Sequence, residues 1–186
     1  MNESGKEMLM ATDLKARQEI IDMLNEARAM ELHAIVQYMN QHYGLDDMDY
    51  GLPAGKVKLI AIDEMRHAEM FAERIKELGG EPMTDRSAKV RHGQEVEEIF
   101  GFNSGLEEDT IAAYNRFLAK CREAGDNVTA RVFDTVIDEE QIHLNYFDNE
   151  NRHMEKLGAA YLATWAGTSS ATGLPAMMGF AASQAE

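Results

Sequence analysis

Residues 60–71 read Ile-Ala-Ile-Asp-Glu-Met-Arg-His-Ala-Glu-Met-Phe, and this stretch decides the fold because it places two ionisable side chains on an apolar helix face. At helical spacing, Ile60, Glu64, His67 and Phe71 all fall on one face. A buried carboxylate without a partner costs several kcal/mol. The pattern therefore predicts a helix whose inward glutamate is paired, protonated or bound to a metal ion.

The same arrangement occurs a second time. Glu140 and His143 lie between apolar residues on another predicted helix, and two further helices carry one inward glutamate each, Glu31 and Glu107. The interval from Glu31 to Glu64 is 33 residues, as is the interval from Glu107 to Glu140. A shift of 76 residues along the sequence therefore superimposes Glu31, Glu64 and His67 on Glu107, Glu140 and His143. Four carboxylates and two imidazoles are expected to converge.

A Glu-x-x-His pair is a weak signal by itself. With 21 Glu and six His among 186 residues, chance gives fewer than one such pair, and the chain has three. The third pair, Glu150 with His153, lies near the end of the fourth predicted helix, where no other helix supplies an inward carboxylate at its level. We interpret this pair as unrelated to the site.

The predicted fold class is all-α: an antiparallel four-helix bundle with a long crossover between the second and third helices and a short C-terminal fifth helix. The expected segments are helices over about 13–43, 53–78, 106–124 and 125–157, a crossover over 81–104 and a fifth helix over 159–166. Residues 1–158 then form the bundle, and 159–186 form the short helix and a flexible tail. Glu31 lies 13 residues before Gly44 and Glu64 lies 13 residues after Gly51, so both carboxylates reach the same depth.

The amino-acid composition excludes some classes of function. Acidic residues outnumber basic ones by 33 to 18, and the net charge of −15 repels nucleic acid and anionic membranes while attracting cations. No stretch has the ~18 consecutive apolar residues of a membrane span, and the polar N-terminus lacks the apolar core of a signal peptide. The single cysteine, Cys121, cannot form an internal disulfide, which favours a reducing compartment. We therefore expect a cytoplasmic protein without nucleic-acid or membrane partners.

One inward glutamate on each of two helices, with Glu-x-x-His on the other two, is the ligand arrangement of ferritin-like di-iron carboxylate proteins. Over about residues 14–165 the chain resembles the bacterioferritin family in particular. The resemblance is carried by residues 31–38 (Glu-Leu-His-Ala-Ile-Val-Gln-Tyr), 63–67 (Asp-Glu-Met-Arg-His) and 138–143 (Asp-Glu-Glu-Gln-Ile-His). The intervals of 33, 43 and 33 residues between the four glutamates match that family without gaps.

The resemblance implies iron storage and detoxification by a ferroxidase, which oxidises Fe(II) to Fe(III) with dioxygen or peroxide at two iron ions within each subunit. In that family pattern Glu31 and His67 would bind one iron, Glu107 and His143 the other, and Glu64 and Glu140 would bridge. The resemblance also implies a 24-subunit shell of two-fold dimers that encloses the mineral. One haem-type porphyrin per two subunits would take Met65 of each as axial ligand, and a small electron-transfer protein would be a partner.

Several residues near these motifs need separate interpretation. Tyr38 lies on the stripe of the first helix, where it could hydrogen-bond a ligand carboxylate, donate an electron or simply pack in the core. Tyr114 and Cys121 are interpreted as core residues. Asp63 is a candidate for an extra iron ligand on the inner surface, where Leu59 offers none. Three histidines fall off the apolar stripes and are expected on the surface: His33, His42 and His92.

Alternative functions remain open at this point. The cluster could be a set of buried hydrogen-bonded polar residues. It could belong to a rubrerythrin-like or manganese-catalase-like peroxide scavenger, although Thr110 stands where rubrerythrins typically carry a further glutamate and one cysteine excludes their Cys-x-x-Cys module. It could also hold structural metals in a haem-binding electron carrier. A fast phase of ferrous oxidation saturating near two irons per subunit would separate a ferroxidase from the carrier.

Overall fold

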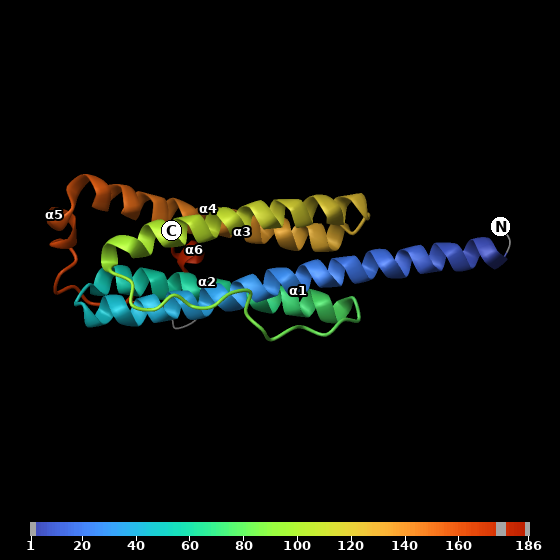
Figure 1. Ribbon diagram of the computed structural model, residues 1–186, viewed down its shortest axis with the longest axis horizontal. Coiled ribbons are helices and arrows are strands. Elements are labelled where there is room, and N and C mark those ends of the chain that lie inside the picture. Colours follow the sequence, from blue (N-terminus) through green and yellow to red (C-terminus); the bar gives the residue numbers. More distant parts are fainter. Residues whose placement is uncertain (1–2, 174–177, 185–186) are drawn as a thin grey trace.

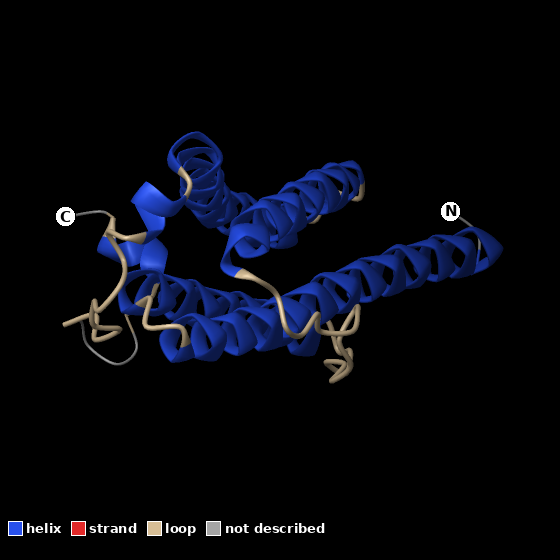
Figure 2. Ribbon diagram, turned by 60° about the vertical axis from the view of Figure 1, so that its left-hand side comes forward, coloured by secondary structure: helices blue, strands red, loops and turns tan. Residues whose placement is uncertain are grey.

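The computed structural model describes residues 3–173 and 178–184, and most of these residues are helical (Figure 2). The helices are α1 (Glu3–Asp47), α2 (Gly51–Glu77), α3 (Val96–Glu123), α4 (Asn127–Leu157), and the short α5 (Ala159–Leu162) and α6 (Phe180–Ser183). Helix α1 packs along α2, and α3 packs along α4, with α1 extending beyond the other helices at its N-terminal end (Figure 1). The prediction of an all-α four-helix bundle is confirmed. None of the described helices is long and apolar enough to span a membrane.

Helix α3 begins at Val96, well before the start predicted near Leu106. The sequence-based prediction left this part of the helix out because of Gly101 and Gly105, since glycine is less favourable than alanine in a helix by about 1 kcal/mol. Burial of Val96 and Phe100 in the core compensates for that cost. The crossover is correspondingly shorter than predicted, covering residues 78–95.

Side chains of α1 hold the crossover along the bundle. The Arg28 guanidinium donates to the carbonyl oxygen of Met83 at 2.9 Å, and the Gln37 amide donates to the carbonyl oxygen of Arg91 at 3.0 Å. These bonds satisfy backbone groups that a segment without regular structure cannot pair internally. The crossover therefore has a fixed course along α1, from the end of α2 to the start of α3 at the opposite end of the bundle.

Two of the three histidines expected on the surface are buried, so that expectation is wrong for them. His33 lies beneath the crossover, with Nδ1 3.1 Å from the carbonyl oxygen of Ala88. His42 lies against the start of α2, with Nδ1 2.9 Å from the carbonyl oxygen of Ala54. His92 is exposed, as expected. Both errors arise because segments distant in sequence cover positions that lie off the apolar stripe of their own helix.

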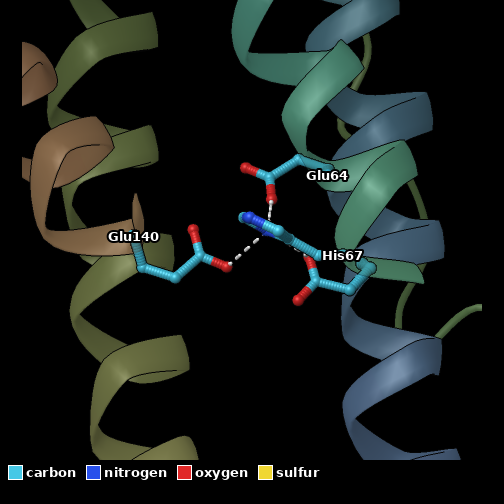
Figure 3. A group of neighbouring side chains, drawn as sticks. Glu64, His67 and Glu140 are labelled. Atoms are coloured by element: carbon cyan, nitrogen blue, oxygen red, sulfur yellow. Dashed lines mark hydrogen bonds and ion pairs between the residues drawn. The ribbon is translucent and has the colours of Figure 1, made fainter. Parts of the chain in front are cut away.

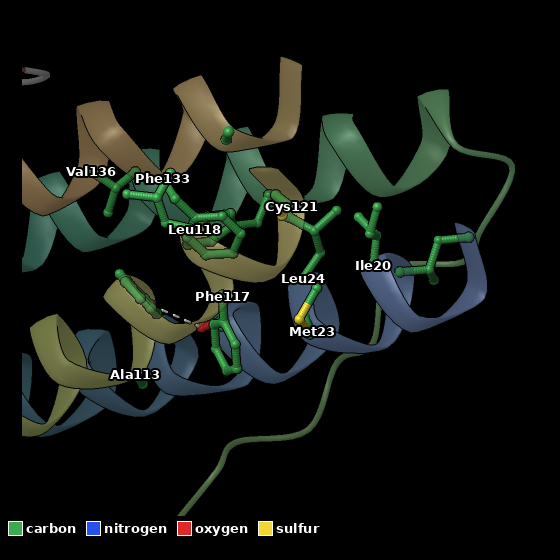
Figure 4. Packing of buried hydrophobic residues seen from close by; sticks show 14 of the residues in the cluster. Ile20, Met23, Leu24, Ala113, Phe117, Leu118, Cys121, Phe133 and Val136 are labelled. Carbon is green, nitrogen blue, oxygen red and sulfur yellow. Dashed lines mark hydrogen bonds between the residues drawn. The ribbon is translucent and has the colours of Figure 1, made fainter. Parts of the chain in front are cut away.

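Two apolar clusters fill the bundle on either side of a polar middle layer. Figure 4 shows the first cluster, in which Leu24, Phe117, Cys121 and Phe133 pack together. The second cluster includes Tyr38, Ile60, Phe100 and Phe147. The ionisable groups of the middle layer therefore lie in an environment of low polarity, where both attraction and repulsion between charges are strong.

The C-terminal region folds back onto the bundle. Helix α5 is shorter than predicted, but Trp165 beyond it is buried. The Thr168 hydroxyl accepts a hydrogen bond from the backbone N–H of Leu52 at 2.8 Å, which satisfies a donor at the start of α2. In α6, Phe180 and Ala181 are buried. The expectation of a loosely held tail therefore does not describe these two residues.

Candidate metal centre

Six ionisable side chains from the four long helices meet in the polar middle layer, and all six are buried. Helix α1 contributes Glu31, α2 contributes Glu64 and His67, α3 contributes Glu107, and α4 contributes Glu140 and His143. They form two groups whose ligand atoms lie within 4.8 Å of one another: Glu31, Glu64, His67 and Glu140, and Glu64, Glu107, Glu140 and His143. The structure thus brings together all six residues that the sequence singled out, and Glu64 and Glu140 belong to both groups.

Each shared glutamate presents one oxygen to each imidazole, and Figure 3 shows both glutamates beside the first imidazole, His67. Glu64 Oε2 lies 3.0 Å from His67 Nδ1, and Glu64 Oε1 lies 3.2 Å from His143 Nδ1. Glu140 Oε1 lies 3.2 Å from His67 Nδ1, and Glu140 Oε2 lies 3.0 Å from His143 Nδ1. This is the placement that a carboxylate needs to bridge two metal ions.

The donor set fits a pair of metal ions. Among the described residues, the Oε1 atoms of Glu64 and Glu140 are buried without a hydrogen-bond partner. Only an imidazole nitrogen at 3.2 Å faces each of these oxygens, and a cation between the two groups would give both a direct ligand bond. Carboxylate and imidazole ligands suit iron or manganese, and no thiolate is present in either group.

The outer nitrogen of each imidazole faces a carboxylate from the opposite helix. His67 Nε2 lies 3.1 Å from Glu139 Oε2, and His143 Nε2 lies 3.2 Å from Asp63 Oδ2. Such carboxylates fix the imidazole orientation and leave the inner nitrogen free to bind metal. Asp63 is buried and engaged with His143, so it is not an accessible inner-surface ligand. Sequence reasoning missed these roles, although the 76-residue shift that relates the ligands also carries Asp63 onto Glu139.

Two tyrosines cross the bundle to the remaining glutamates. The Tyr38 hydroxyl on α1 donates to Glu107 Oε1 on α3 at 2.5 Å, and the Tyr114 hydroxyl on α3 donates to Glu31 Oε1 on α1. Of the roles considered for Tyr38, the hydrogen bond to a ligand carboxylate is present. Tyr114 is buried in the core, as predicted, but its hydrogen bond was missed. The same 76-residue shift carries Tyr38 onto Tyr114 and could have revealed it.

Burial perturbs the carboxyl groups of the centre. It raises the pKa values of Glu31 and Glu107 well above their usual range, and the negative charges of Glu140 and Glu64 raise them further. Burial alone would also raise the pKa of Glu140. The positive charges and hydrogen bonds of His67 and His143 outweigh burial and lower the pKa of Glu140 to about 2. Burial and the neighbouring negative charges therefore favour the protonated forms of Glu31 and Glu107 when no metal is bound.

The two imidazoles respond in the opposite direction. Burial alone would lower the pKa values of His67 and His143, because it disfavours the charged form. The surrounding carboxylates outweigh burial, Glu140 chiefly for His67 and Glu64 chiefly for His143, and both pKa values rise well above the usual range. The surrounding carboxylates therefore favour the protonated forms of both imidazoles in the metal-free protein.

We expect metal binding to release protons, because Glu31, Glu107, His67 and His143 bind metal in their deprotonated forms. Since all four pKa values are raised, protons compete with the metal, and affinity should fall as the pH falls. Titration of metal-free protein with Zn²⁺ in weak buffer containing a pH indicator measures the release. The Glu150→Ala variant is the control and should release the same number, whereas release near zero from the parent would contradict the protonation states.

Other residues lie outside the centre. Glu150 accepts a hydrogen bond from the Tyr161 hydroxyl at 2.7 Å and, like His153, belongs to neither ligand group. Met65 follows Glu64 on α2 but points outward, with 42% of its surface exposed. The sequence-based placement of Met65 outside the centre agrees with this position.

The fold and the ligand layer define the class of protein, and comparison with known proteins agrees. The ferritin-like domain family matches residues 21–157. The bacterioferritin of Desulfovibrio desulfuricans is 60% identical over 161 residues, which cover 87% of this chain and 89% of that protein. The chain therefore belongs to the bacterioferritin family.

Solved structures show the same relationship. An X-ray structure of the D. desulfuricans bacterioferritin, which shows the diiron site in different catalytic states, matches with a TM-score of 0.86 and 57% identity over 88% of this chain and 96% of that chain. The Rhodobacter capsulatus bacterioferritin, with a metal-free dinuclear site and a haem iron in a crystallographic special position, matches with a TM-score of 0.78 and 27% identity. That match covers 83% of this chain and 98% of that chain. The bundle is thus the ferritin-like fold.

Proposed function

We propose that this protein binds ferrous iron at the centre, oxidises it to ferric iron, and stores the product. The observation that carries the proposal is the pair of overlapping ligand groups that share Glu64 and Glu140. Glu31 and His67 hold one iron in this proposal, Glu107 and His143 hold the other, and the two shared carboxylates bridge. The diiron site of the D. desulfuricans relative supports iron as the metal.

The chain's own residues prepare the site for this reaction. Two ferrous ions bound side by side supply two electrons together to dioxygen or peroxide, which avoids one-electron products. Asp63 and Glu139 hold the outer nitrogens of the imidazoles, so that both Nδ1 atoms face the metals. The hydroxyls of Tyr38 and Tyr114 hold one oxygen of each terminal glutamate. The apolar clusters on both sides exclude water from the reacting layer.

Stopped-flow mixing of ferrous iron with metal-free protein tests the proposal. We expect a fast phase of oxidation that saturates near two iron ions per chain, followed by slower uptake of further iron. Hydrogen peroxide and dioxygen are tested separately as oxidants. Absence of the fast phase would favour a carrier with structural metals, and peroxide consumption without iron retention would favour a peroxide scavenger.

Storage requires an enclosed space, and we propose a closed homo-oligomeric shell of 24 chains assembled from two-fold dimers in the cytoplasm. The outward Met65 on α2 supports a contact between chains, because exposed apolar side chains in mid-helix often mark subunit interfaces. A monomer mass in light scattering, across a range of salt, would contradict the shell.

We further propose that Met65 binds the iron of a haem-type porphyrin at the two-fold contact. The residue fits this role, since its thioether is exposed and a two-fold axis would bring two copies face to face. The haem iron of the R. capsulatus relative lies on a special position, which is consistent with a haem shared by symmetry-related chains. Such a group would exchange electrons with stored iron and with a small electron-transfer protein.

A further inference from the structure

The metal centre has two nearly equivalent halves, but its outer carboxylates differ in their surroundings. Asp63, which supports His143, has a fully buried side chain, whereas the side chain of Glu139, which supports His67, is 23% exposed. Both lie on the face between α2 and α4. Helix α6 packs on both α2 and α4 (Figure 1), and its residue Ala181 contacts Asp63.

The C-terminal segment contacts Asp63 directly. The backbone N–H of Ala181 donates to Asp63 Oδ2 at 2.8 Å, and this is the same oxygen that faces His143 Nε2. The other oxygen accepts from the Arg66 guanidinium at 2.7 Å. Gly179 lies so close that a Cβ atom there would be 1.7 Å from Asp63 Oδ1. Only glycine permits this approach without displacing either the carboxylate or the segment.

Phe180 anchors the segment beside the imidazole. Its side chain is 3% exposed, with its ring centroid 4.9 Å from that of Tyr146 and 6.3 Å from that of His143. The Lys56 ammonium lies 5.4 Å from the centre of the Phe180 ring on the α2 side. Burial of this ring removes apolar surface from water and so favours docking of the segment.

We propose that residues 178–184, here named the strap, close the α2–α4 face over one half of the metal centre. The strap fixes Asp63, Asp63 fixes His143, and the metal held by Glu107 and His143 therefore leaves more slowly than the metal held by Glu31 and His67. On the other half, Glu139 lies near Arg66 but has no contact with the strap among the described residues, so its imidazole turns away from the metal more readily. This inference rests on the proposed metal centre.

Release of cobalt tests the strap. Full-length protein is loaded with Co²⁺, which does not require an oxidant and absorbs visible light, and is then mixed with excess chelator. We expect two phases of equal amplitude, a fast one and a slow one. In Gly179→Ala, where the added Cβ displaces the strap from Asp63, the slow phase should accelerate about tenfold or more, the scale on which outer carboxylates affect metal affinity.

Three further variants test the two halves of the metal centre independently. Phe180→Ala removes the anchor without inserting an atom and should accelerate the same slow phase. Glu139→Gln should accelerate only the fast phase, because it weakens the support of His67. Gly44→Ala is the matched control: a Cβ there meets nothing within 4 Å, so both phases should keep their rates. Circular dichroism verifies that each variant keeps the helical bundle.

The outcomes distinguish the strap from the metal centre itself. If the parent does not bind two Co²⁺ ions per chain, the proposed centre and the strap both fail. If it binds two and loses them in one uniform phase, or if Gly179→Ala and Phe180→Ala leave the slow phase unchanged, the strap is wrong and the centre stands. A crystal structure of metal-free Gly179→Ala should show His143 rotated away from Asp63, and an unchanged contact would also overturn the proposal.

Discussion

With alanine in place of Glu140, we expect rapid oxidation of ferrous iron to slow by more than about 100-fold, while the chain still forms the bundle. Loss of an outer carboxylate typically costs 10–100-fold in metal affinity or activity, and a ligand shared by both metals should cost more. The structure places Glu140 in both ligand groups, with one oxygen near each imidazole. Its loss therefore affects the pair of metals and not one alone. Stopped-flow absorbance of the ferric product measures the rate.

The chain offers a matched control for this variant. Glu150 lies on the same helix and also begins a Glu-x-x-His pair, but it is bonded to Tyr161 and lies outside the centre. Glu150→Ala should therefore oxidise iron at the parent rate. Glu64→Ala should behave like Glu140→Ala, because the 76-residue shift relates the two residues. Oxidation at the parent rate in either bridging variant would show that the carboxylates do not bridge.

The second large effect concerns Met65. Met65→Leu should purify without porphyrin, whereas the parent should carry one low-spin porphyrin per two chains. Leucine keeps nearly the same packing volume, so the contact between chains should survive while the thioether ligand is lost. A thioether is a soft ligand that favours ferrous haem. The ratio of porphyrin absorbance to protein, together with the native mass, measures both results.

Met70→Leu is the control for the loss of a thioether from α2. Met70 is partly buried and packs against the first apolar cluster, so its sulfur is not presented to a neighbouring chain. This variant should keep its full porphyrin content. If Met65→Leu also keeps a full complement of low-spin porphyrin, Met65 is only an interface residue and another group binds the iron.

The inward ligands could be located from the sequence because helical periodicity fixes direction. Glu64 and His67 share the stripe of Ile60 and Phe71, and the structure buries them there. Asp63 and Glu139 were not recognised because each directly precedes a ligand and so points about 100° away from it. Their role depends on the helix opposite, which periodicity along one helix does not describe.

Electrostatics within the centre also needed three-dimensional information. The sequence suggested four carboxylates that repel one another in the absence of metal. In the structure His67 and His143 lie between Glu64 and Glu140, so the metal-free layer is held by charge pairs as well as by hydrogen bonds. The strap was beyond prediction for a different reason. Its seven residues are too few to show a helical period, and its position depends on Gly179 fitting against Asp63 and on burial of Phe180.

The hydrogen bonds that two tyrosines and two outer carboxylates make to the ligands cross between two helical hairpins, α1–α2 and α3–α4. Tyr38 on the first hairpin holds Glu107 on the second, and Tyr114 on the second holds Glu31 on the first. The outer carboxylates cross in the same reciprocal way. Each hairpin therefore supplies two of these four supports to the ligands of the other hairpin. Two copies of one hairpin related by a two-fold axis would contain the same ligands and the same supports, so this single chain has the internal architecture of a dimer.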